Sequence, residues 1–140
     1  MNLELAIHAG QLIVTIFNSS AHVRRLWEWN NSWGWESLTI QIRTEAGQPR
    51  EIKRKSRDFT KNGPVYFEML PQEKREVVIN FHDGWWEPAL VNSQNQGLEL
   101  RARLQIARTP ESDQFGVFTG TVVSEWIKSD PQHRWLPTQG

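Results

Sequence analysis

The side chains in this chain that are best suited to chemistry are its tryptophans, and the chemistry they suit is recognition. Four of the eight tryptophans lie within nine residues, and two more follow each other further along the chain. An indole joins a large apolar face to one N–H donor, which suits a surface that is apolar and partly wet. Tryptophan and arginine are also the residues most enriched at the energetic centres of protein interfaces. The candidate partner-binding residues are Trp27, Trp29, Trp33, Trp35, Trp85, Trp86, Arg24 and Arg25.

The Trp-rich segment, residues 27–35, allows three interpretations. Its indoles could close the end of a β-sheet core, form a contact patch for another protein, or stack on the apolar face of a sugar ring. In an extended backbone Trp27 and Trp29 would point to one side, and so would Trp33 and Trp35. Because such pairs could not all be core, the pattern favours some exposure.

No residue pattern in the chain indicates catalysis. A Gly-x-Ser-x-Gly turn, a paired-histidine zinc helix, a phosphate-binding loop and a dinucleotide fingerprint are all missing from the sequence. The four histidines are scattered, and His82-Asp83 is typical of a strand end followed by a turn. The chain has no cysteine, which excludes disulfides, thiolate catalysis and cysteine-based zinc sites. We therefore expect a non-enzymatic protein without a cofactor or metal.

A basic stretch, residues 50–61, is the second candidate for ligand contact. Its charge could meet phosphates, but Glu51 and Asp58 dilute it, and sixteen acidic residues balance the sixteen basic residues of the whole chain. Basic side chains on an edge strand also prevent sheets from pairing edge to edge. We expect an edge strand over 50–57, with nucleic-acid binding as an alternative function. The basic residues are Arg50, Lys53, Arg54, Lys55, Arg57 and Lys61.

Alternation of apolar and polar residues with period two predicts β-strands along most of the chain. Strands are expected at 3–8, 12–17, 38–43, 50–57, 65–70, 76–81, 98–106 and 116–127. The main connections are the Trp-rich segment, a loop over 83–96 with one helical turn near 87–91, and a polar turn over 109–114. The strand over 98–106 has the clearest pattern, which predicts Leu100 in the core and Arg101 at the surface.

Strands of this number and spacing predict two packed sheets, because a single sheet would leave one apolar face in water. The expected fold is all-β, an immunoglobulin-like antiparallel β-sandwich of about seven or eight strands. A closed barrel with the same strands is the alternative. At 140 residues the chain is long enough for one domain, which we place over 1–128, followed by an irregular C-terminal tail over 129–140.

Three motifs resemble small bacterial immunoglobulin-like sandwich proteins. They are VTIFNSS at 14–20, LPQE at 70–73 and VFTGTVVS at 117–124. The resemblance extends over residues 3–127 and implies a sandwich framework, while it transfers no site residues. The cysteine and tryptophan signature of antibody domains is missing, since the chain has no cysteine.

The N-terminal residues predict a cytoplasmic location. The first twenty residues contain Glu4 and neither lysine nor arginine, and their apolar stretch is too short for a signal peptide or a membrane span. The expected function is that of a non-enzymatic protein-binding module, of the inhibitor or immunity type, that uses Trp-rich loops and binds no membrane. Carbohydrate binding through exposed tryptophans is the first alternative.

Overall fold

The computed structural model describes residues 1–43, 48–60, 62–88 and 97–129, and the chain is all-β. Most of the expected C-terminal tail, much of the 83–96 loop with its expected helical turn, and Lys61 lie outside these residues. The strands are β1 (Asn2–His8), β2 (Gln11–Phe17), β3 (Arg24–Trp27), β4 (Leu38–Arg43), β5 (Arg50–Ile52), β6 (Tyr66–Met69), β7 (Lys74–Ile79), β8 (Glu99–Ile106), β9 (Gly120–Val123) and β10 (Ile127–Lys128), and the helix is α1 (Pro110–Phe115).

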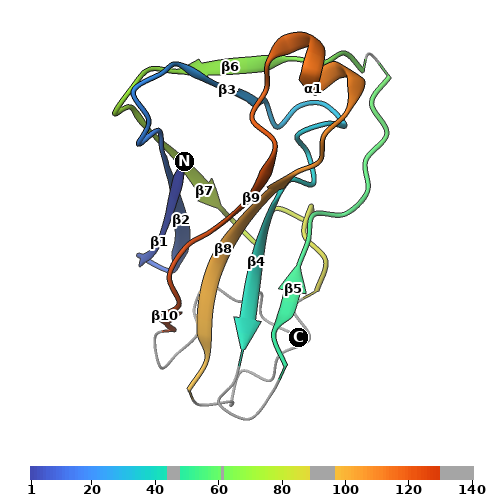
Figure 1. Cartoon of the computed structure of the whole chain (residues 1–140). Coiled ribbons are helices and arrows are strands. Elements are labelled where there is room, and N and C mark those ends of the chain that lie inside the picture. The colour runs from blue at the N-terminus through green and yellow to red at the C-terminus, as the bar shows by residue number, and fades with distance from the viewer. Residues whose placement is uncertain (44–47, 61, 89–96, 130–140) are drawn as a thin grey trace.

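The strands form three antiparallel sheets (Figure 1). One sheet has the order β1-β2-β7, and the largest has the order β10-β8-β4-β5, with β9 also paired to β8. Strands β3 and β6 form a two-stranded sheet that crosses the top of the molecule in Figure 1. The prediction of an all-β antiparallel fold is confirmed. The closed barrel is not formed by the described strands.

The two larger sheets share one hydrophobic core. Leu12, Val14 and Ile16 of β2 are fully buried, and β8 alternates in the same way, with Leu100 buried as predicted and Arg101 half-buried rather than fully at the surface. Buried residues of both sheets belong to one continuous cluster. Each buried leucine or isoleucine stabilises the fold by about 1.5–3 kcal/mol relative to an exposed one. The core therefore holds the sheets together and supports the strand ends that carry the candidate site.

The expected edge strand over 50–57 is confirmed in position but is shorter than predicted. Strand β5 lies at the edge of the largest sheet and ends at Ile52. Beyond this point the backbone continues to pair through an isolated antiparallel bridge between Arg54 and Trp86. The pairing thus leads directly from the edge of the sheet into the second group of tryptophans.

The sequence pattern does not predict β3. Its last two residues, Leu26 and Trp27, are consecutive and both buried, so no alternation marks the strand. The strand pairs with β6, with Trp27 opposite Tyr66. Trp27 therefore belongs to a strand and not to the connection assigned to it.

The expected polar turn over 109–114 is wrong, because these residues form the N-cap and most of α1. The Thr109 hydroxyl accepts a hydrogen bond from Ser112 N (3.1 Å), and Ser112 Oγ accepts one from Thr109 N (2.8 Å). Pro110 fits the first turn of a helix, and Gly116 ends the helix with a φ of 63°. A helix of this length is too short to show an apolar period of 3.6 residues.

The single strand expected over 116–127 is also wrong, because this segment serves two sheets. Near its start Phe118 N donates a hydrogen bond to Arg25 O of β3 (2.8 Å), and later residues form β9 and β10 against β8. Ser124 separates β9 from β10, and its hydroxyl accepts a hydrogen bond from Ala102 N of β8 (2.8 Å). The apolar alternation continues along this segment although its pairing partner changes from β3 to β8.

Candidate functional site

A buried asparagine organises the Trp-rich segment into turns rather than extended backbone. Asn31 Oδ1 accepts hydrogen bonds from Trp33 N (3.0 Å) and Gly34 N (3.1 Å), and its Nδ2 donates to Val65 O (3.0 Å). A Cβ at position 34 would collide with the carbonyl group of Glu28, so only glycine fits there. The four indoles therefore do not pair on two sides of a strand. They diverge into three separate places.

Trp27 and Trp33 pack at the end of the core beside α1. Their ring centroids are 5.9 Å apart, and Trp27 also meets Phe115 edge-on at 6.4 Å. Trp27 is buried and Trp33 is half-buried. Trp29 is half-buried and packs against Phe67 at 6.4 Å between centroids. These three indoles mainly cover the core, as the first interpretation of the segment expected.

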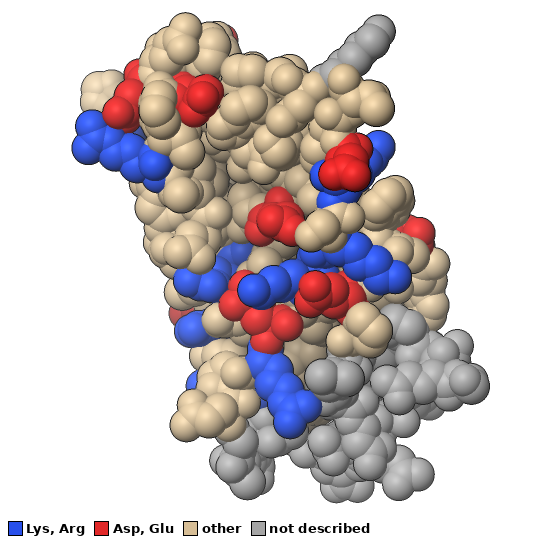
Figure 2. Space-filling model, turned by 90° about the vertical axis from the view of Figure 1, so that its right-hand side faces the viewer, with Lys and Arg blue, Asp and Glu red and all other residues tan. Residues whose placement is uncertain are grey.

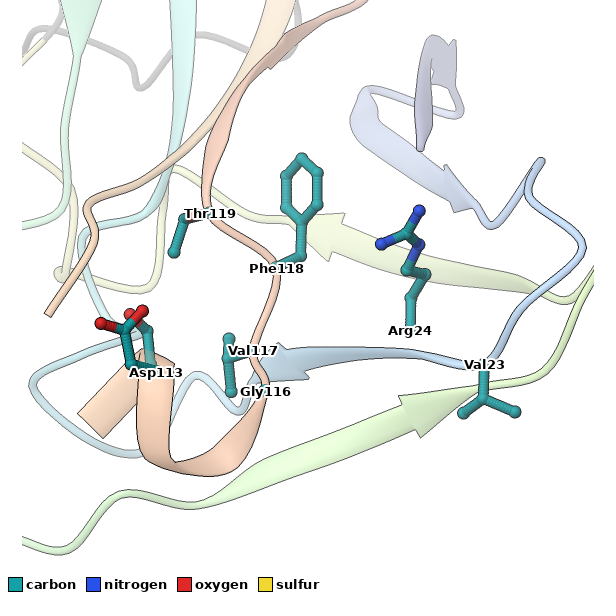
Figure 3. Close-up of a pocket in the computed structure, with 8 residues that line it drawn as sticks. Val23, Arg24, Asp113, Gly116, Val117, Phe118 and Thr119 are labelled. Atoms are coloured by element: carbon teal, nitrogen blue, oxygen red, sulfur yellow. The ribbon is translucent and has the colours of Figure 1, made fainter. Parts of the chain in front are cut away.

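The two candidate arginines of β3 lie apart from the exposed tryptophan. The Arg25 guanidinium lies 4.6 Å from the ring centroid of Tyr66, and its Nη1 donates a hydrogen bond to Phe115 O (2.8 Å). Arg24 is exposed and lines an open groove of about 440 Å³ with Asp113 and Phe118 (Figure 3). In Figure 3 the groove lies between the start of β3 and the chain that follows α1. Asp113 is already paired with Arg108 (3.0 Å).

The second group of tryptophans meets the end of the Trp-rich segment. We call the residues that meet there the Trp35–Trp85 cluster. Its backbone is fixed by two hydrogen bonds, from Lys55 N to Trp85 O (2.7 Å) and from Glu87 N to Lys53 O (2.8 Å). The cluster consists of Trp35, Arg54, Arg57, Phe59, Trp85 and Trp86.

Within the cluster, buried rings hold an exposed one. Trp35 is 6% exposed and donates a hydrogen bond from Nε1 to Lys55 O (2.8 Å). Trp85 is 41% exposed, and its ring meets Trp35 edge-on at 5.5 Å between centroids and 89° between planes. Trp86 is buried and packs edge-on against Phe81 at 5.3 Å. Such edge-to-face pairs add about 0.5–1.5 kcal/mol beyond area burial, so Trp85 is held in place although 41% of it is exposed.

Two guanidinium groups complete the cluster. Arg54 Cζ lies 4.3 Å from the centroid of Trp35 and 5.1 Å from that of Trp86. Arg57 Cζ lies 5.0 Å from the centroid of Trp85 and 5.1 Å from those of Trp35 and Phe59.

The environment of Arg54 disfavours its charge. Burial lowers its pKa because the charged form loses water, the charge of Asp83 opposes this shift, and Arg57 adds to it. Its Nε is buried, and the described part of the chain offers it no hydrogen-bond partner.

Of the sequence candidates, the structure brings Trp35, Trp85 and Trp86 together and places Trp27, Trp29, Trp33, Arg24 and Arg25 elsewhere. Trp27, Trp35 and Trp86 are buried, so they offer little surface for direct contact with a partner. The sequence did not group Arg54, Arg57 and Phe59 with the tryptophans. Alternation from buried Ile52 would have turned Arg54 inward, which is the signal that could have found it.

The charged surface does not form a uniform basic face. In the basic stretch, Lys53, Lys55 and Arg57 are exposed, while Glu51 pairs with Arg103 of β8 (3.2 Å). Figure 2 shows basic and acidic side chains interleaved across the middle of the face on the right of Figure 1. Such mixing weakens the long-range attraction that phosphate backbones require.

Neither a metal site, a membrane helix nor a similar known protein indicates a function for the described residues. Over the described ranges no three His, Asp or Glu side chains are grouped so that they could hold a metal ion. No helix in the described part of the chain is long and apolar enough to cross a membrane. The chain matches no family model, no curated protein and no solved structure.

Proposed function

We propose that this protein is a non-enzymatic protein-binding module whose contact surface is the Trp35–Trp85 cluster. The observation that carries the proposal is the position of Trp85, which keeps 41% of its surface exposed while buried Trp35 fixes its ring. A rigid, exposed aromatic side chain loses little conformational entropy on binding and offers a large apolar area. The adjacent Arg57 supplies the other residue type that dominates interface energetics.

The arrangement favours a protein ligand over a sugar. Among the tryptophans that the structure describes, Trp85 alone is exposed, whereas Trp29 and Trp33 are half-buried and pack elsewhere. A single indole provides one stacking face and little direction along a sugar chain. A protein partner can use the indole, the Phe59 ring beside it and the guanidinium of Arg57 together.

The framework that presents the cluster belongs to the same proposal. We interpret the two larger sheets as an immunoglobulin-like sandwich, with the cluster just beyond edge strand β5. By analogy with other binding proteins of this architecture, a rigid sandwich that presents an edge surface suits an inhibitor or immunity-type role.

Affinity capture from a lysate of the native host tests the proposal. The native protein should retain a stoichiometric partner, and Trp85→Ala should weaken the complex by about 2 kcal/mol or more, as expected of an interface hot spot. Leu70→Ala is the matched control, because Leu70 is 60% exposed and lies directly after β6. Equal retention by both variants would place the binding site elsewhere. Capture of a polysaccharide, lost in Trp85→Ala, would favour the carbohydrate alternative.

A further inference from the structure

Four ring-stacked arginines that the structure describes each have a polar side-chain partner. Arg43 lies 4.0 Å from the Trp126 centroid and pairs with Glu99 (3.2 Å), and Arg75 lies 3.7 Å from the Phe67 centroid and pairs with Glu28 (3.2 Å). Arg25, over Tyr66, pairs with Glu68 (3.6 Å), and Arg101, 4.5 Å from the Trp126 centroid, donates a hydrogen bond to Gln41 Oε1 (2.6 Å).

Arg54 and Arg57 are different. Both lie over rings, but no ion pair joins either of them to a carboxylate within the described ranges. Against the lowering effect of burial, the charge of Asp83 raises the pKa of Arg54, but Asp83 Oδ1 already accepts a hydrogen bond from Trp85 N (2.8 Å). The cluster thus holds two guanidinium groups in place with rings alone.

A guanidinium group that contacts a ring can still donate hydrogen bonds to an anion through its other N–H groups. The N–H groups of a guanidinium lie in its plane, and two that reach solvent can donate hydrogen bonds side by side to one carboxylate. Arg57 is exposed, so its N–H groups can be reached from solvent. Arg54 lies deeper against Trp35 and Trp86 and adds positive potential from behind.

We propose that Arg57, supported by Arg54, receives a carboxylate side chain of the partner protein while Trp85 covers an apolar side chain next to it. This inference rests on the proposed function and specifies the partner's contact as an acidic segment with interspersed apolar residues. Such an anion would also offset the like charge and burial that disfavour the charged form of Arg54.

The local charge favours one or two carboxylates over a polyanion. Segments 53–58 and 83–87 together carry four basic and three acidic residues, so their net charge is small. A small net charge gives weak long-range attraction, and the binding energy must come from short, directed contacts. A carboxylate on a protein surface meets this requirement better than a nucleic-acid backbone does.

Fluorescence anisotropy with a labelled short peptide of alternating glutamate and leucine tests the inference on the full chain. The glutamine counterpart should bind about tenfold more weakly, because it lacks the charged acceptor. Arg57→Gln should weaken the glutamate peptide about tenfold and leave the glutamine peptide unchanged. Lys53→Gln is the matched control: it removes the same charge from an exposed residue of the same stretch, and the expected change is about twofold or less.

Arg57→Lys separates charge from geometry. It keeps the positive charge but loses the planar fork, so the glutamate peptide should still bind severalfold more weakly than to the native protein. Thermal melting of each variant checks that the fold is intact. If Arg57→Gln has a lowered melting temperature, the peptide affinity of Arg57→Lys is used instead.

Three results would overturn the inference. Equal losses in Arg57→Gln and Lys53→Gln would show that only general charge matters. Binding of an oligothymidine as tight as that of the glutamate peptide, and dependent on Arg57, would assign the site to nucleic acid. Failure of the glutamate peptide to bind would remove the carboxylate assignment, while loss of the lysate partner in Trp85→Ala would still support the proposed function.

Discussion

Replacement of Asn31 by alanine should disorganise the Trp-rich segment at a large and specific cost in stability. Asn31 is 1% exposed, and its side chain makes four hydrogen bonds to backbone groups. Two of the four partners keep a second bond, since Gly34 N also donates to Asn31 O (3.3 Å) and Val65 O also accepts from Glu28 N (2.8 Å). The N–H of Trp33 and the carbonyl of Glu28 would lose the bonds described for them.

The magnitude follows from this count. A backbone group that keeps another partner loses about 0.5–1 kcal/mol, and a shielded group left without one costs about 1–3 kcal/mol. The free energy of unfolding of Asn31→Ala should therefore fall by at least about 3 kcal/mol. Urea denaturation followed by tryptophan fluorescence measures this difference as a shift in midpoint at constant slope.

Asn62 provides the matched control for this measurement. Its side chain also binds the segment, accepting from Ser32 N (3.0 Å) and donating to Ser32 Oγ (2.7 Å), but these groups are exposed. Water can replace such bonds, so Asn62→Ala should cost about 0.5 kcal/mol or less. Equal losses in the two variants, or a loss below about 1 kcal/mol for Asn31→Ala, would refute the idea that one buried amide organises the segment.

Three further substitutions test the core, the turn and the helix, each by chemical denaturation. Leu100→Asp places a carboxylate in the core and should cost more than about 4 kcal/mol, whereas Arg101→Asp on the opposite face should cost about 1 kcal/mol; equal losses would contradict the assignment of the two faces. Gly34→Ala forces a methyl group against the Glu28 carbonyl and should cost at least about 1–3 kcal/mol, and an unchanged midpoint would exclude this close contact. Thr109→Ala removes the helix cap and should cost about 1 kcal/mol, while Thr109→Ser should restore most of it if the hydroxyl is what matters.

Strands β2 and β8 of the two larger sheets could be predicted because each of their two faces meets one environment. In β8 every second residue from Leu100 onward enters the core, so the sequence alternates with the same period as the backbone. The same holds for β2, where Leu12, Val14 and Ile16 are buried. Alternation is a local property, and a local pattern is what a sequence displays directly.

The small sheet and the helix could not be predicted because their residues are specified by distant partners. Leu26 and Trp27 of β3 are both buried, since Trp27 packs beside Phe115 of α1. No residue near Trp27 in the sequence indicates that a helix will arrive there. The short helix in turn depends on a cap and not on an apolar stripe.

The candidate site shows the same division between local and distant causes. Its residues were recognisable by type, because indoles and guanidinium groups suit recognition wherever they lie. Their exposure depends on which segments meet. Trp35 is buried because Phe59 and Trp85 close over it, and Trp85 stays exposed because it is the outermost ring of that stack.

The cluster also explains why the basic stretch seemed to offer a separate function. Pairing beyond β5 sets Arg54 beside Trp86, and Arg57 then reaches the exposed Trp85. Two of the stretch's cations are thereby fixed against rings, whereas Lys53 and Lys55 point to solvent as expected for a protected sheet edge. Basic residues that are adjacent in sequence thus divide between two roles, and the arginines join the tryptophans because their guanidinium groups can stack on a ring and still bind an anion in their plane.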